Sequence, residues 1–268
     1  MKDKRVLFIS SEVVPYLPET EISSNSFQAA KTVNSIGGQT RIFMPRFGNI
    51  NERRHQLHEV IRLSGMNLVI NDLDMPLIIK VASIPKERMQ VYFIDNEEYF
   101  KRKATFTDED GKLFADNDER AIFFAKGVIE TVKKLNWAPD IIHVHGWMAS
   151  LLPLYLKQYF KDEPLFTDSK VVTSIYADGY EGDLGKELIA KIKFDKIEEA
   201  SLEVLKESSY VNLMKLAADN SDGVIFGSED VNSELMSYVK NSETPTLDYK
   251  SPDEYESAYA GFYKSLMV

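Results

Sequence analysis

Short apolar runs that alternate with helical stretches limit the folds open to this chain. The runs are rich in β-branched and aromatic residues and stand at 5–9, 40–44, 90–94, 141–145, 170–174 and 223–226. Between them apolar residues recur with a helical period, as in Ala121, Ala125, Val128 and Val132. Strands joined by helices of this length form right-handed crossovers between parallel neighbours. The sequence therefore predicts an α/β fold, one Rossmann-like domain with a mostly parallel sheet.

Three segments refine this prediction. Residues 57–84 contain two strand-like runs close together around Asn71-Asp72, which predicts a small antiparallel excursion. Gly37-Gly38 predicts the end of the first helix. Residues 186–217 form a charged, helix-favouring region, for which we expect two helices that are broken near Ser208-Ser209.

The chain shows no internal repeat, and we expect one domain over residues 1–240. Residues 241–250 are polar and contain Pro245, so they are predicted to form a linker. In residues 251–268, Ser251 and Glu254 make a capping box and Pro252 suits the first helical position. One face of this last helix is apolar, and we expect it to pack back on the sheet domain. Its apolar residues are Tyr255, Tyr259, Phe262 and Leu266.

Composition excludes several classes of protein. The 44% hydrophobic content is enough for a sizeable core, and the net charge of −10 repels nucleic acid and anionic membranes but not a neutral polymer such as a glucan. The absence of cysteine excludes disulfides and thiolate metal sites. No apolar run approaches the roughly 18 residues of a membrane span, and Met1–Arg5 lead directly into a strand without a signal peptide, so a cytoplasmic location is expected.

Six phrases of the sequence identify a family resemblance. In order and spacing they are similar to the N-terminal domain of bacterial glycogen synthases and plant starch synthases, and the similarity extends from Arg5 to about Tyr238. The phrases are VLFISSEVVPY, RIFMPRF, VYFIDNEEYFKR, DNDERAIFFAKGVIE, PDIIHVHGWMASLLPLYL and VNLMKLAADNSDGVIFGS.

The resemblance implies half of a GT-B fold, in which two Rossmann-like domains face each other across a cleft. Enzymes of this family transfer glucose from a nucleotide sugar to the non-reducing end of an α-1,4-glucan, with retention and without a metal or other cofactor. Their C-terminal domain supplies most of the nucleotide-sugar pocket, and the N-terminal domain supplies the acceptor side. We expect that the C-terminal donor domain is missing from this chain and that the last helix resembles the helix with which such enzymes end.

The loop after the first strand departs from the family. There the family carries Lys-Thr-Gly-Gly, whose lysine and close backbone hold the donor. This chain has Pro18, Glu19, Thr20 and Glu21, and no glycine lies between Ser10 and Ser26. The change removes a cation, adds two anions and removes the residues that let backbone N–H groups approach a phosphate. The resemblance therefore implies a degenerate donor loop.

Two further positions differ from the family's motifs, and three match them. The family's His-x-His-Asp-Trp reads His143-Val144-His145-Gly146-Trp147, so glycine replaces the acid. The family strand ending in Thr-Val-His-Asn reads Thr173-Ser174-Ile175-Tyr176, with isoleucine in the histidine's place. The resemblance implies that Glu12, Arg46 and Lys215 match family positions. No catalytic residue is assigned.

Some patterns have more than one interpretation. His143 and His145 share a strand face, which suits either a metal with a third ligand or histidines held by hydrogen bonds; the family uses the pair without metal, so we expect none. The acidic segment 105–119 lacks the glycine spacing of a calcium loop and is predicted to be a loop before a helix capped by Asp116 or Asn117.

Aromatic and acidic residues near the strand ends are also ambiguous. Trp147, Tyr176 and Tyr180 follow predicted strands, where open α/β sheets place their ligands, so they either contact a sugar ring or pack in the core. Asp178 with Glu181 or Asp183 has the composition of a hydrolase acid and base, but nothing in the sequence positions them.

The sequence leaves two main hypotheses. The first is a protein of glycogen metabolism, non-catalytic alone, that binds α-glucan or a protein partner, including a full-length synthase or a second copy, through the face that a partner domain would cover. An exposed apolar patch on that face would indicate a protein partner. The alternative is an active glycogen synthase completed by a second chain, and a third possibility is an enzyme that uses another sugar. Candidate ligand contacts are Glu12, Arg46, His143, His145, Trp147, Tyr176 and Lys215.

Overall fold

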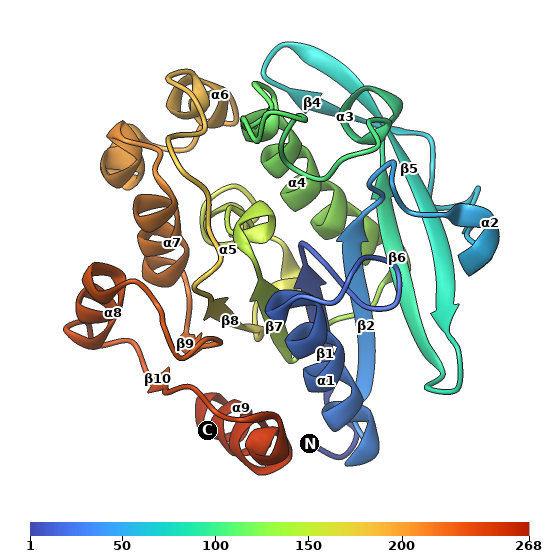
Figure 1. Ribbon diagram of the computed structural model, residues 1–268, viewed down its shortest axis with the longest axis vertical. Helices are drawn as coiled ribbons and strands as arrows, with labels where there is room; N and C mark the ends of the chain where they lie inside the picture. The colour runs from blue at the N-terminus through green and yellow to red at the C-terminus, as the bar shows by residue number, and fades with distance from the viewer. Residues whose placement is uncertain (268) are drawn as a thin grey trace.

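A computed structural model describes residues 1–267 of the chain. Its described strands form a mixed sheet in the order β10-β9-β8-β7-β1-β2-β6-β5-β3, with β4 paired to β5 (Figure 1). The parallel strands are β1 (Arg5–Ser10), β2 (Gln39–Pro45), β6 (Met89–Asp95), β7 (Ile141–His145), β8 (Lys170–Ile175), β9 (Gly223–Phe226) and β10 (Thr246–Leu247). The predicted α/β class and mostly parallel sheet are confirmed.

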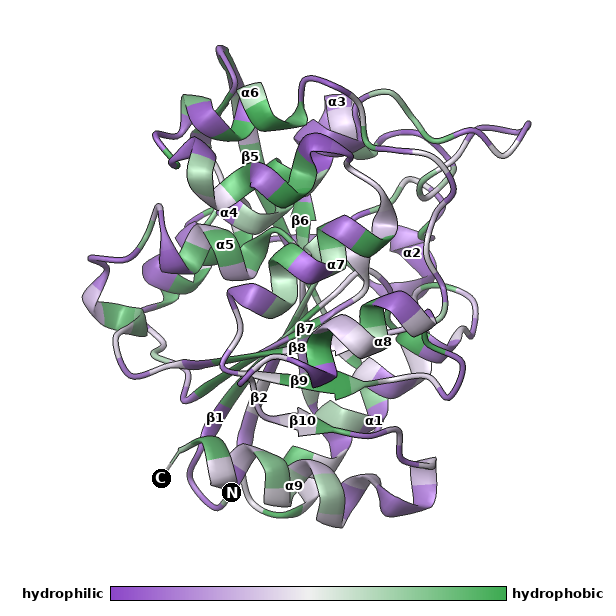
Figure 2. Cartoon of the chain, turned by 90° about the vertical axis from the view of Figure 1, so that its left-hand side faces the viewer, coloured by the Kyte–Doolittle hydropathy of each residue, from purple (hydrophilic) through white to green (hydrophobic). Residues whose placement is uncertain are grey.

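Helices cover both faces of the sheet. α1 (Glu21–Ser35) lies beside α9 (Tyr255–Leu266) on one face, and α4 (Asn117–Leu135), α5 (Leu152–Lys157) and α7 (Tyr210–Asp219) lie on the other (Figure 1). Because both faces are covered, the central strands read as continuous apolar runs, and all five residues of β7 are buried. Figure 2 shows hydrophobic strands between helices that carry both hydrophilic and hydrophobic residues.

The remaining elements are short. They are α2 (Glu52–His55), α3 (Glu97–Phe100), α6 (Leu188–Phe194), α8 (Ser233–Lys240) and the 3₁₀ helices η1 (Trp147–Ala149), η2 (Pro164–Phe166), η3 (Glu199–Lys206) and η4 (Pro252–Glu254). No described helix has the length and apolar character that a membrane span requires.

The antiparallel excursion is confirmed. β4 (Met66–Ile70) and β5 (Leu73–Ile84) form a hairpin whose turn is Asn71-Asp72, and β3 (His58–Glu59) pairs with β5. The excursion reaches further than expected, because β5 also runs antiparallel to β6.

Three local predictions need correction or refinement. The break at Ser208-Ser209 is where expected, and the Ser209 side chain caps α7, but the preceding region divides again into α6 and η3. Asp116 stands at the N-cap position of α4 without a capping hydrogen bond, because its carboxylate accepts from Arg102. Residues 241–250 include the two-residue strand β10, which pairs with β9.

The last helix packs back on the domain, as predicted. The capping box of Ser251 and Glu254 forms at η4, and α9 buries its aromatic face against α1 and the sheet. The chain divisions at residues 240 and 250 stay a prediction.

Candidate functional site

The strand order reverses direction between β1 and β7, and open α/β sheets bind their ligands at the carboxyl ends of the strands at such a point. The loops after β1, β7, β8 and β9 meet there. Their exposed residues are polar or small, and no large exposed hydrophobic residue among residues 1–267 belongs to these loops. Among the described residues, these loops thus present a largely polar surface at the carboxyl edge.

Side chains of the degenerate loop and of the first turn of α1 cap the start of this helix. The Thr20 hydroxyl accepts from the Ser23 N–H at 3.1 Å, and the Ser23 hydroxyl accepts from the Thr20 N–H at 2.8 Å, so the two residues form a capping box at the start of α1. Ser23 is fully buried. The helix end that would face an anion is therefore occupied by the chain's own side chains.

Carboxylates surround this helix end. Glu21 accepts a hydrogen bond from Ser228 after β9, and Glu19 accepts one from Ser24 at 3.2 Å. Among residues 1–267, no lysine or arginine forms an ion pair with Glu12, Glu19 or Glu21. The loop is anionic and lacks the cation that a phosphate would require.

Glu12 is held by the same loop. Thr20 donates its hydroxyl proton to the Glu12 carboxylate at 2.5 Å. Burial raises the pKa of Glu12, the Thr20 hydrogen bond opposes this shift, and the nearby charge of Asp178 adds to it. Glu12 and Thr20, which sequence singled out for different reasons, are thus brought together.

The two histidines lie in the core. His143 and His145 are fully buried with ring centroids 3.9 Å apart. His143 hydrogen-bonds to Tyr263 at 2.6 Å through Nδ1 and to Ser174 at 2.8 Å through Nε2. His145 Nδ1 lies 2.7 Å from the Tyr176 hydroxyl, whereas its Nε2 has no hydrogen-bond partner among residues 1–267.

Burial keeps this pair neutral. Desolvation lowers the pKa of His145 to about 3, and desolvation together with His145 lowers the pKa of His143 well below its usual value. The described residues contain no group of three potential metal ligands. The geometry therefore favours hydrogen-bonded histidines over a metal pair.

Gly146 follows β7 directly and lies against Ser11, which follows β1. Its φ is +79°, and a Cβ at this position would lie 2.3 Å from the Ser11 hydroxyl oxygen. Ser11 is itself fixed, because its N–H donates to the His145 carbonyl at 2.9 Å. The family's acidic side chain has no room here unless Ser11 moves.

Aromatic rings form a row along the carboxyl edge. Phe106, Trp147, Tyr180 and Tyr210 follow one another with centroid distances of 4.8, 5.0 and 6.0 Å. Trp147 is only 4% exposed, because Phe106 and Tyr180 contact its ring. Tyr180 and Tyr210 line an open pocket of about 460 Å³, together with the loop after β8 and the starts of α7 and α8.

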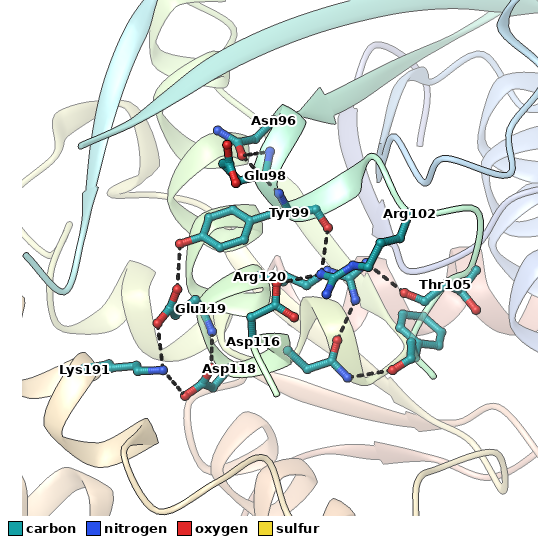
Figure 3. A network of polar contacts seen from close by, with 12 residues as sticks. Asn96, Glu98, Tyr99, Arg102, Thr105, Asp116, Asp118, Glu119, Arg120 and Lys191 are labelled. Carbon is teal, nitrogen blue, oxygen red and sulfur yellow. Dashed lines mark hydrogen bonds and ion pairs between the residues drawn. The ribbon is translucent and has the colours of Figure 1, made fainter. Parts of the chain in front are cut away.

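A buried arginine fastens the loop that carries Phe106 (Figure 3). Arg120 donates to the Asn117 side chain at 2.5 Å and to the Thr105 carbonyl at 2.8 Å, and Asn117 donates to the Phe106 carbonyl. The guanidinium of Arg120 lies 5.2 to 5.5 Å from the centroids of three phenylalanine rings. Burial lowers its pKa to about 9.

Arg46 and Lys215, the two cations among the candidate residues, form ion pairs away from the loop of residues 18–21. Arg46, at the end of β2, pairs with the buried Asp95 at 2.9 Å, and Lys80 joins Asp95 to Glu52. Lys215, on α7, pairs with Glu234 at 2.6 Å. Neither cation joins the loop of residues 18–21.

Residues 5–245 match the family described as the starch synthase catalytic domain. The chain belongs to this family. The glycogen synthase of Chlorobium limicola is 36% identical over 219 residues, which are 81% of this chain and 44% of the relative. That of Chlorobium phaeovibrioides is 33% identical over 240 residues, 89% of this chain and 48% of the relative. The chain thus spans less than half the length of these relatives.

A solved structure of a starch synthase catalytic domain has the same fold. The catalytic domain of starch synthase IV from Arabidopsis thaliana, solved with ADP and acarbose, gives a TM-score of 0.69. The alignment covers 98% of this chain and 50% of the starch synthase chain at 14% identity, so it shows a shared fold and nothing more.

Sequence patterns did not indicate several residues that lie beside the candidate residues. Tyr210 and Tyr263 bond to the candidate residues Tyr176 and His143, and Asn25 bonds to the Gly227 carbonyl after β9, although none of the three stands in a motif that we singled out for ligand binding. Tyr210 had one usable signal, since it directly follows the helix-capping Ser209. The other contacts join segments far apart in sequence and leave no local pattern.

Proposed function

We propose that this starch synthase-type domain binds α-glucan at the carboxyl edge of its sheet and does not transfer glucose by itself. The observation that carries the proposal is the start of α1, where Thr20 and Ser23 cap the helix and carboxylates surround it. A nucleotide sugar would bring a pyrophosphate to this place. Repulsion between two unit charges is about 1 kcal/mol at 4 Å in water and several times larger in a partly dry cleft.

A neutral sugar does not meet this obstacle. The pocket of about 460 Å³ is large enough for a glucose residue, and Tyr180 provides a half-buried aromatic face for a sugar ring. Its rim carries Glu181, whose carboxylate is an acceptor for sugar hydroxyls. These features support glucan binding without nucleotide-sugar binding.

The alternative function is an active glycogen synthase completed by a donor half on another chain. The retained Glu12 and Lys215 favour it, but both already have partners within this chain. This function would require the loop of residues 18–21 to release its internal hydrogen bonds and accept a pyrophosphate.

The test is calorimetric titration of the protein with maltoheptaose, ADP-glucose and UDP-glucose in separate experiments. We expect heat from maltoheptaose only. A signal from either nucleotide sugar would contradict the non-catalytic part of the proposal and support the alternative. The absence of heat from maltoheptaose would contradict glucan binding and favour a protein partner as the ligand.

The pocket assignment predicts the effect of one substitution. Tyr180→Ala should weaken maltoheptaose binding about tenfold, because it removes the aromatic face from the pocket. Tyr238→Ala is the control, since Tyr238 is a partly exposed tyrosine on α8 outside the pocket. Equal affinities of the two variants would argue against this pocket.

A further inference from the structure

The interface between α9 and the rest of the domain contains a chain of polar contacts. Tyr255 of α9 donates to the side-chain oxygen of Asn25 on α1. The same Asn25 amide donates at 2.9 Å to the carbonyl of Gly227, which follows β9. Asn25 is 5% exposed, so its polar atoms depend on partners within the protein.

Asn25 stands one turn after the degenerate loop. In the first turn of α1, Glu21 accepts from the Ser228 hydroxyl, which itself accepts from the Ala177 N–H after β8. The start of α1 is thus tied to the ends of β8 and β9, and through Asn25 to α9. Figure 1 shows α1 and α9 side by side on one face of the sheet.

A second polar contact fastens the other end of α9. Tyr263 reaches His143 in the central strand β7, and Tyr259 packs edge-on against the same imidazole at 6.1 Å. Polar contacts that are buried together stabilise a position only when all partners are in place. The segment before the helix, residues 241–250, is exposed or half-buried and offers few restraints of its own.

We propose that α9 is a clasp that controls the conformation of the degenerate loop through Asn25. When α9 is docked, Tyr255 orients the Asn25 amide toward Gly227, and the start of α1 is held against the ends of β8 and β9. When α9 loosens, Asn25 loses one partner, and Pro18–Glu21 gain freedom to move. The clasp deepens the proposed function, because it would regulate the edge at which we place the glucan, but its contacts exist without any ligand.

Hydrogen exchange of the unliganded protein tests the clasp. Tyr255→Phe removes only the hydroxyl that reaches Asn25, and we expect about tenfold faster exchange of the amides at the start of α1, as for the loss of one buried hydrogen bond. Exchange in β5 and β6 should stay unchanged. Tyr238→Phe is the matched control, because its hydroxyl bonds to Asp219 on the other side of the sheet.

Coupling is reciprocal, so a second variant tests it from the other end. Ser228→Ala releases Glu21 without touching α9, and we expect faster exchange within α9. The proposal is overturned if Tyr255→Phe loosens α9 alone, or if either variant speeds exchange uniformly through the domain. Because no glucan is present, these outcomes are independent of whether the proposed function holds.

Discussion

At the scale of single residues, Gly146 determines whether a side chain can stand at the end of β7. Its positive φ and the nearby Ser11 hydroxyl leave no space for a side chain between β1 and β7. The backbone conformation and the neighbouring serine thus both disfavour an acidic side chain at this position. A single substitution back to aspartate would collide with Ser11.

Two glycines of positive φ differ in the space around them, and Gly146 also has a ψ of 155°, a backbone conformation that is essentially limited to glycine. Gly111 has a φ of +78° and open space around it. Gly111→Ala should therefore lower the free energy of unfolding by about 1 kcal/mol through strain alone. Gly146→Ala should lower it by about 2 to 4 kcal/mol, since overpacking adds to the strain. Urea unfolding of both variants measures the difference, and equal losses would show that neither the contact with Ser11 nor the backbone conformation of Gly146 is costly.

At the scale of elements, the segment between α3 and α4 forms a small hairpin over the aromatic row. Thr107 and Leu113 form an isolated antiparallel bridge, and Phe106 at its base covers Trp147. Arg120 of α4 holds this base, as Figure 3 shows for its contact with Thr105. The exposure of Trp147 to a ligand is thus set by the hairpin and by the helix beneath it.

Removing the arginine should loosen the hairpin. Arg120→Met keeps an apolar side chain among the three phenylalanine rings but leaves the Thr105 carbonyl and the Asn117 side chain without their donor. We expect about tenfold faster hydrogen exchange at Asp108 and Phe114, whose amides bond across the hairpin. Arg53→Met is the control, because Arg53 is exposed on α2. Unchanged exchange at both amides would mean that packing alone holds the hairpin.

At the scale of the whole molecule, buried ionisable groups link stability to pH. His143 and His145 are neutral in the folded state, because burial lowers the pKa of each. Unfolding restores ordinary pKa values near 6.5, so the unfolded chain binds more protons below that pH. Burial raises the pKa of Glu12 and of Asp118, which has the opposite sign, since these carboxyls favour the folded state as they gain protons.

Stability should therefore fall as the pH drops from 7 to 5. With a folded pKa of about 3, His145 alone should reduce the free energy of unfolding by about 2 kcal/mol over this range. Urea unfolding at several pH values checks the slope, and His145→Gln should flatten it. An unchanged slope in His145→Gln would mean that His145 keeps an ordinary pKa in the folded protein.

Local patterns were enough to predict the elements, the class of sheet and the family. The period of apolar residues depends on neighbours a few positions apart, so the strands, the Asn71-Asp72 turn and the capping box at Ser251 could be predicted from sequence. The acidic, glycine-free character of residues 18–21 was also evident from sequence alone. The match over residues 5–245 confirms the family that the six phrases indicate.

Tertiary structure alone decided which side chains meet. The sequence did not indicate that Tyr263 reaches His143, that Asn25 joins α9 to β9, or that Phe106 covers Trp147. Each contact joins segments far apart in the chain, and its partners are chosen by strand order and helix packing. Burial followed from the same packing, and burial, through loss of hydration, set the pKa values of the two histidines.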